Sequence, residues 1–276
     1  KDMQLMDHFT MEQLSLPGIV LMENAGSAVV NEVLNDFPNK RTNILVLAGG
    51  GNNGGDGFVI ARRLIDFGYD VLLLLAVDEE SLKGDAKLHY DAYKKRQLPI
   101  ANAENYDMNN AQVIVDALLG TGVQGAVREP FYSLINAVNE SAAFVYAVDV
   151  PSGVNADTGE VANVAIRANK TITFVLPKKG FYLQQGPQFI GEIVCADISV
   201  PLSLVQTLNL DLPTCITHDL GKGAVPKRLA HGHKGTFGHV LIIGGCQNYV
   251  GATMYTAKAA FHSGAGLVTL AIPETI

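Results

Sequence analysis

The residues with the clearest chemical potential lie in three short polar segments, each directly after an apolar run. The first, GGGNNGGDG at 49–57, follows NILVLA at 43–48 and precedes a helical pattern. Glycines let a ligand approach the backbone and expose consecutive N–H donors, and a helix N-terminus favours a phosphate. Gly49, Gly51 and Gly54 also satisfy GxGxxG, a pattern of dinucleotide-binding loops that tight turning alone can also produce.

The polar side chains of this loop could contact a ligand or a cation. Asn52 and Asn53 offer amide oxygens, which suit an alkali or alkaline-earth cation better than a soft metal. Asp56 lies near the expected start of the helix, where it could either contact a ligand or cap the helix. Asp78 ends the next apolar run, close to the place of a ribose-binding acid. An NAD-dependent oxidoreductase is therefore one interpretation.

The second segment, DALLGTGVQG at 116–125, begins with a carboxylate inside an apolar run. If Asp116 is buried there, it needs a hydrogen-bonding partner or a cation; otherwise it faces solvent. Gly120, Gly122 and Gly125 could form a second backbone cradle.

The third segment, VDVPSG at 148–153, places Asp149 at the end of an expected strand. A carboxylate in that position could transfer a proton or could cap an Asx turn. Ser152 offers a hydroxyl and a carbonyl oxygen, but GxSxG is absent, so it is not expected to be a nucleophile.

The elements that must position these segments alternate along the chain. We expect helices from Thr10, where Gln13 completes a capping box, and from Pro17. Further buried strands are expected at 70–76, 112–119, 143–150, 170–176 and 191–196, with helices over 58–65, 83–96 and 132–139. Apolar strands alternating with helices predict an α/β fold with a mostly parallel sheet covered on both faces. Ligands bind at the carboxyl ends of such strands, where all three segments fall.

The strand and helix pattern breaks near 201–226 and restarts with a strand at 239–243, a helix at 252–262 and the strand LVTLAI. A piece of this size rarely buries enough surface to fold alone. We therefore expect a complete domain at 1–210, a linker at 211–232 and the truncated start of a second domain at 233–276.

Composition excludes several classes of protein. The chain of 276 residues is 48% hydrophobic and 17% charged, which is typical of a globular core. Its 20 Lys and Arg against 27 Asp and Glu predict no nucleic-acid partner. The apolar run at 71–77 is far shorter than the roughly 20 residues of a membrane span, so no membrane association is expected. Three scattered cysteines fit a reducing compartment and a cytoplasmic location.

Four ordered motifs resemble the signature set of the NAD(P)H-hydrate epimerase family. They are MENAG at 22–26, GNNGGDGFVIAR at 51–62, DALLGTG at 116–122 and VDVPSG at 148–153. The C-terminal segments HKGTFGHVLIIGG, YVGA and SGAGLVTLAIPE resemble the opening of an ADP- or ATP-dependent NAD(P)H-hydrate dehydratase domain. The resemblance implies a Rossmann-like three-layer fold, then the beginning of a ribokinase-like α/β domain, in a bifunctional nicotinamide-nucleotide repair enzyme.

The resemblance also implies an activity and a site. The activity is epimerisation at C6 of hydrated NADH or NADPH (NADHX or NADPHX), with the dehydratase activity, which would use ADP or ATP and Mg²⁺, lost from this chain. Asp149 is the expected acid–base residue, and one K⁺ would be held by Asn53, Asp116 and Ser152. The implied substrate-binding residues are Asn52, Asn53, Gly54, Gly55, Asp56, Gly120, Thr121, Gly122, Val123, Gln124, Gly125, Ala126 and Asp149.

Two alternatives to the epimerase remain open at this point: the NAD-dependent oxidoreductase, and a non-catalytic nucleotide-binding or scaffold module. The oxidoreductase would need a hydride-transfer site, for which no Tyr–Lys or His–Arg pattern stands out. Retention of Asn53, Asp116, Asp149 and Ser152 favours catalysis over a scaffold. We also expect a homo-oligomer, because an apolar face on the helix that carries MENAG would permit a dimer.

Overall fold

The computed structural model describes residues 2–102, 106–228 and 230–276. It divides into two compact units, Lys1–Pro213 and Thr214–Ile276. The three polar segments that could carry chemistry all belong to the first unit.

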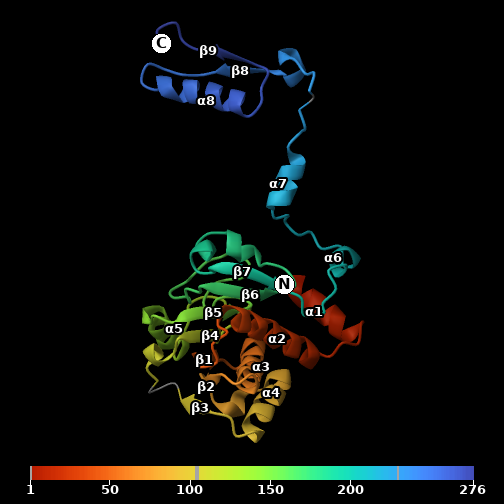
Figure 1. Cartoon of the computed structure of the whole chain (residues 1–276), viewed down its shortest axis with the longest axis vertical. Coiled ribbons are helices and arrows are strands. Elements are labelled where there is room, and N and C mark those ends of the chain that lie inside the picture. Colours follow the sequence, from red (N-terminus) through yellow and green to blue (C-terminus); the bar gives the residue numbers. More distant parts are fainter. Residues whose placement is uncertain (1, 103–105, 229) are drawn as a thin grey trace. The chain divides into compact units, whose positions relative to one another are not determined.

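A parallel sheet forms the centre of the first unit, with seven strands among the described residues (Figure 1). In the sheet they follow the order β3-β2-β1-β4-β5-β6-β7, and every neighbouring pair is parallel. Their bounds are β1 Asn43–Ala48, β2 Asp70–Leu75, β3 Ile100–Asn102, β4 Val113–Ala117, β5 Phe144–Val148, β6 Lys170–Phe174 and β7 Glu192–Ala196. The predicted parallel α/β sheet is confirmed. Only β3 was not predicted, because three residues are too short a run to stand out.

Helices cover both faces of this sheet, as a strand with alternating side chains requires. Ile44, Val46 and Ala48 of β1 pack in one apolar cluster with the first four helices, whereas Leu45 and Leu47 pack in another with the fifth. The helices are α1 Asp2–Glu12, α2 Gly18–Asp36, α3 Asn52–Asp66, α4 Gly84–Lys95, α5 Phe131–Glu140 and the short α6 Leu204–Thr207. The Rossmann-like three-layer arrangement is therefore confirmed.

The strand order places a topological switch point between β1 and β4. The chain proceeds from β1 to β2 and β3 on one side, and from β4 to β5, β6 and β7 on the other. Connections that leave β1 and β4 in opposite directions open a crevice beyond their carboxyl ends. The glycine-rich segment follows β1 and the DALLGTG segment ends β4, so both border this crevice.

The first helix differs from its prediction. Thr10 lies inside α1, and its hydroxyl donates a hydrogen bond to the carbonyl of Met6 at 2.8 Å, so the predicted capping box is wrong. The helix begins at Asp2 because Met3, Met6 and Phe9, three residues apart, pack together against the core. This shift is what brings the side chains of α1 to the functional crevice.

The helix that carries MENAG, α2, buries the apolar face that was expected to permit a dimer. The apolar residues of α2, among them Leu21, Met22, Val29 and Val33, are buried within the chain itself. That face is occupied by the core and is not left for a second copy, so the oligomeric state stays a prediction.

The second unit holds one βαβ motif. It contains α7 His218–Ala224, β8 His239–Ile243, α8 Val250–His262 and β9 Leu267–Ala271, and β8 pairs with β9 in parallel. Large apolar side chains of this unit are exposed to solvent, such as Ile243 (78% exposed) and Tyr255 (76% exposed). The helix α7 falls inside the segment expected as a linker. None of the helices in the described part of the chain has the length and apolar character that a bilayer crossing requires.

Candidate active site

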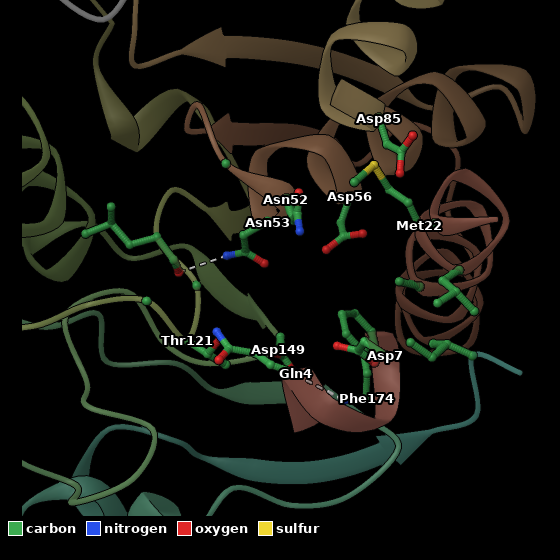
Figure 2. A pocket seen from close by; sticks show the side chains of 18 of the residues that line it. Gln4, Asp7, Met22, Asn52, Asn53, Asp56, Asp85, Thr121, Asp149 and Phe174 are labelled. Carbon is green, nitrogen blue, oxygen red and sulfur yellow. Dashed lines mark hydrogen bonds between the residues drawn. The ribbon is translucent and has the colours of Figure 1, made fainter. Parts of the chain in front are cut away.

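The three polar segments line one cavity of about 550 Å³ at the carboxyl ends of β1, β4 and β5 (Figure 2). From α3 come Asn52, Asn53 and Asp56, and from the turn after β5 comes Asp149. The helix α1 closes another side with Gln4 and Asp7. Segments that are far apart in the sequence therefore meet at the switch point of the sheet.

The residues expected to bind substrate occupy three kinds of position. Those that line the cavity are Asn52, Asn53, Asp56, Gly120, Thr121, Gly122, Val123 and Asp149. Gly54 and Gly55 are buried in the first turn of α3. Gln124 and Gly125 at the end of the second segment, and Ala126 after it, are not among the described residues that line the cavity. The expected cation ligands Asp116 and Ser152 are fully buried.

Close packing explains two glycines of the motifs. A Cβ on Gly54 would lie 1.9 Å from the carbonyl oxygen of Gly49, and a Cβ on Gly26 would lie 2.5 Å from the side chain of Val59. The first glycine lets α3 begin against the end of β1, and the second lets α2 approach α3. Both contacts fix where the first turn of α3 presents its side chains.

Asp56 does not cap the helix, which corrects one of its two sequence interpretations. The N-cap is Gly51, so Asp56 lies within α3, where its side chain points into the cavity (Figure 2). Burial is the main cause that raises the pKa of Asp56 well above its usual range, and the charges of Asp149 and Asp7 raise it further. The raised pKa favours the protonated form of this carboxyl group, which can donate a hydrogen bond.

A buried hydrogen-bond network joins the second and third segments beside the cavity. Asp116 accepts hydrogen bonds from the Ser152 hydroxyl at 2.6 Å and the Ser152 amide at 2.8 Å. The Ser152 hydroxyl oxygen also accepts a bond from the Leu119 amide at 2.9 Å, and Asn53 donates to the Leu119 carbonyl at 2.9 Å. Asn53, Asp116 and Ser152 are thus connected through Leu119.

The chemistry of this network fits a hard cation with oxygen ligands. The Oδ1 atom of Asn53 is buried and has no hydrogen-bond partner. Asp116 is fully buried with no ion pair to a described residue, and desolvation raises its pKa to about 6 even though three hydrogen bonds lower it. A monovalent cation would satisfy the amide oxygen and offset the carboxylate. The described residues contain no His, Cys, Asp and Glu cluster of the kind that holds a transition metal.

Asp149 occupies a constrained position at the edge of the cavity. Its backbone adopts a left-handed conformation with φ of 63°, which is uncommon outside glycine and tends to occur at functional sites. Oδ1 accepts hydrogen bonds from the Thr173 hydroxyl at 3.1 Å and the Phe174 amide at 3.2 Å. The same oxygen lies 2.7 Å from the ammonium nitrogen of Lys178. This carboxylate is thus fixed by β6 and the segment after it.

Two charged residues at this site, Asp7 and Lys178, were not predicted from the sequence. Asp7 lies on α1 one turn after Gln4, and both side chains reach the cavity from the helix that was predicted to start later. The helical spacing of Met3 and Met6 would have shown that α1 includes Asp7. Lys178 follows a buried strand, as the three polar segments do, and that position was the available indication.

Asp78, the ribose-binding acid expected for an oxidoreductase, does not lie at the cavity. Asp78 is exposed, precedes the 3₁₀ turn Glu79–Ser81 and does not line the cavity. Of the GxGxxG glycines, Gly54 and Gly49 therefore serve close backbone packing, a Cβ on Gly51 would meet nothing within 4 Å, and the acidic partner that a dinucleotide loop uses is not at the cavity.

Residues 18–180 match the family described as YjeF-related protein N-terminus. The chain belongs to this family. The matched range of the YjeF-related family spans the sheet from β1 to β6 and includes Asn53, Asp116, Asp149 and Lys178. The helix α1, which supplies Asp7, precedes the matched range.

Relatives of this YjeF-related chain carry a common name. A protein of Moorella thermoacetica called bifunctional NAD(P)H-hydrate repair enzyme Nnr is 37% identical, and the alignment covers 100% of this chain and 54% of that protein. A protein of the same name from Coxiella burnetii is 40% identical, with 93% of this chain and 52% of that protein covered. The chain spans about half the length of the curated relatives it matches.

A solved structure shares the YjeF-related fold. The crystal structure of yeast YNL200c aligns with a TM-score of 0.64 at 23% identity, over 79% of this chain and 95% of that one. This likeness supports the fold of the first unit.

Proposed function

We propose that the first unit epimerises hydrated NADH or NADPH at C6 of the reduced pyridine ring. The observation that carries the proposal is Asp149, a carboxylate held by Lys178 at the edge of a cavity that two glycine-rich segments border. The common name of the relatives supports hydrated NAD(P)H as the substrate. The four motifs in their order support the same assignment.

The reaction needs a proton donor and acceptor beside C6. When an acid protonates the C6 hydroxyl, the lone pair of the adjacent ring nitrogen expels it as water and forms an iminium ion. Water can then add to either face, which inverts C6. A carboxyl group that lines the cavity can supply and recover the proton. A route through an opened ring is compatible with the same residues.

The cavity provides separate places for the two halves of the substrate. The exposed N–H groups at the start of α3 and the segment Leu118–Val123 suit the pyrophosphate, because backbone donors and a helix N-terminus favour negative charge. The carboxyl groups of Asp56 and Asp149 also line the cavity, where the pyridine ring would approach them (Figure 2).

We include one potassium ion in the proposal. Asn53, Asp116 and Ser152 would hold it, and its charge would stabilise the packing of the second and third segments against α3. The unpartnered amide oxygen of Asn53 supports this assignment. The function assigned to Asn53, Asp116 and Ser152 is therefore to hold the walls of the cavity together.

The proposal covers the first unit alone, and no dehydratase step, nor the ADP or ATP it would use, is assigned to the βαβ motif of the second unit. A cytoplasmic location is part of the proposal, and it is supported by Cys195, Cys215 and Cys246, which are all unpaired and exposed.

The test is an assay of epimer exchange on a mixture of the two C6 epimers. The purified protein is expected to interconvert them, and Asp149→Asn is expected to slow the exchange by about 10²–10⁴-fold, the usual contribution of a general acid–base group. Asp157→Asn, at an exposed aspartate outside the cavity, is the matched control and should retain the rate. No exchange by the wild-type protein would overturn the proposal, and unchanged turnover in Asp149→Asn would remove Asp149 from the reaction.

A further inference from the structure

Besides Asp149, the carboxyl groups of Asp7 and Asp56 project into the cavity without partners. Neither side chain forms a hydrogen bond or an ion pair with any residue that the structure describes. Asp56 is only 8% exposed, so its carboxyl group has little access to water. Figure 2 shows Asp7, Asp56 and Asp149 turned towards the same space from α1, α3 and the turn after β5. Unpartnered polar groups inside a cavity indicate a ligand that completes them.

The charges around this space are unbalanced. Lys178 is the cation that influences Asp7, and it forms its close ion pair with Asp149. Asp85 of α4 also lines the cavity and adds another carboxyl group. Among the described residues that face this space, the ammonium group of Lys178 stands against several carboxyl groups, and their mutual repulsion favours retention of protons on some of them. Asp149 is paired with Lys178, whereas Asp7 and Asp56 lack such a partner and burial raises the pKa of both, which favours their protonated forms.

Asp7 and Asp56 differ in how readily they can release a proton. Burial raises the pKa of Asp7 to about 6, while Lys178 lowers it and Asp149 raises it. The pKa of Asp56 lies well above its usual range for the reasons given above. A proton donor works best with a pKa near the working pH. Asp7 meets this condition, whereas Asp56 is suited to remain protonated as a hydrogen-bond donor.

We propose that Asp7 is the second acid–base group of the epimerase site and acts on the C6 oxygen on the ring face away from Asp149. This inference rests on the proposed function. Inversion at C6 requires an oxygen to leave one face and another to arrive at the opposite face. A donor on one wall and an acceptor on another serve both events, and α1 and the β5 turn are different walls of the cavity.

The proposed step moves protons between Asp7, the substrate, water and Asp149. The Asp7 carboxyl group gives its proton to the C6 hydroxyl, and the C6–O bond breaks with both electrons on oxygen, which leaves as water. The ring nitrogen lone pair forms the N=C6 bond. A second water adds to C6 from the opposite face, the N=C6 pair returns to nitrogen, and Asp149 takes the proton from the added water. Nothing is oxidised or reduced, and exchange with solvent returns the proton to Asp7. The reverse epimerisation uses the two groups in exchanged roles.

The decisive experiment compares Asp7→Asn with Asp157→Asn, which removes an exposed carboxyl group that does not line the cavity. In the epimer-exchange assay, Asp7→Asn is expected to lower kcat by about 10²-fold, with KM changed by less than about threefold. Asp157→Asn should keep kcat within about threefold. The wild-type kcat should fall as the pH rises above about 6, where Asp7 loses its proton, and Asp7→Asn should lack this limb. An unchanged kcat in Asp7→Asn would overturn the inference.

A second measurement uses the wild-type protein and needs no variant. In water enriched with ¹⁸O, the two-group route incorporates one solvent oxygen at C6 for each inversion. Inversion with retention of the original oxygen would overturn the route through Asp7. The failures are distinguishable: if the wild type exchanges epimers while Asp7→Asn is unaffected, the proposed function stands and only this inference falls. If the wild type exchanges none, both are overturned.

Discussion

Lys178, whose side chain is only 5% exposed, holds its ammonium nitrogen 2.7 Å from Oδ1 of Asp149. The same nitrogen donates hydrogen bonds to the carbonyl oxygens of Phe174 at 3.1 Å and Leu176 at 3.3 Å. A buried cation with this many oxygen partners is fixed in place, so it fixes the carboxylate that it contacts. Lys178 is therefore a positioning residue for Asp149.

We expect Lys178→Met to slow epimer exchange at least tenfold and to lower the free energy of unfolding by about 2 kcal/mol. Loss of the buried ammonium group removes the cation that pairs with Asp149 and the donor of two carbonyl groups. Asp149 is itself only 18% exposed, so water replaces this cation poorly. Exchange kinetics over a range of pH and urea denaturation measure the two effects. The neighbouring exposed Lys179→Met is the control. Equal rates in both variants would show that Lys178 does not position Asp149.

The carboxyl group of Asp7 should make stability depend on pH. Its folded-state pKa of about 6 lies above its ordinary value of 3.8, so the folded state binds the proton more tightly. The stability that protonated Asp7 contributes to the folded state is therefore fully present below pH 3.8 and is lost as the pH rises through 6. Asp7→Asn has no carboxyl group to titrate, so it does not lose this stability as the pH rises. At pH 7 we expect its free energy of unfolding to exceed that of the wild type by about 1 kcal/mol, after allowance for solvent screening of a partly exposed group.

Urea denaturation of wild type and Asp7→Asn at pH 4, 5.5 and 7 measures this difference. The control Asp157→Asn corrects for the loss of one negative charge at an exposed position. A constant difference between wild type and Asp7→Asn at all three pH values would contradict the raised pKa. This test involves no substrate, so it examines Asp7 independently of the proposed reaction.

Potassium should stabilise the first unit through Asn53. At a K⁺ concentration ten times its Kd, mass action gives about 1.4 kcal/mol, which corresponds to a rise in Tm of about 3–5 °C. Tetramethylammonium at the same ionic strength should have no such effect. Asn53→Leu removes the unpartnered amide oxygen and should abolish the K⁺ dependence, whereas Asn110→Leu, at an exposed site, should preserve it. A K⁺ effect that survives in Asn53→Leu would exclude Asn53 as a ligand.

Gly54→Ala should disturb the start of α3. The added Cβ would lie 1.9 Å from the Gly49 carbonyl oxygen, so either the helix or the end of β1 must move. We expect a loss of about 1–3 kcal/mol in the free energy of unfolding, as for other overpacked positions. Gly122→Ala meets nothing within 4 Å and should change stability by less than about 0.5 kcal/mol. Similar melting temperatures for the two variants would contradict the role of this close approach.

Much of the fold could be predicted because its strands are short, apolar and flanked by glycine. The segment 43–48 corresponds to β1, since a strand buried on both faces gives a continuous apolar run. The segment 170–176 corresponds closely to β6, whose Thr171, Ile172 and Thr173 are β-branched and favour a strand. The edge strand β3 was missed because it is short and lies where less burial is required. The start of α1 was misjudged because Thr10 and Gln13 satisfy a local capping pattern that the packing of Met6 overrides.

The sequence by itself determined the parallel sheet and the three segments that follow β1, β4 and β5, because periodicity and glycine placement are local properties. It also determined that Asp116 lies within a strand and that Asp149 ends one, where a ligand can reach. Only the tertiary structure decided that Asp56 points into the cavity from inside α3, and that Lys178 pairs with Asp149. It alone brought Asp7 to the same space. These relationships depend on contacts between distant segments, and burial and charge at such contacts set the protonation that local sequence cannot specify.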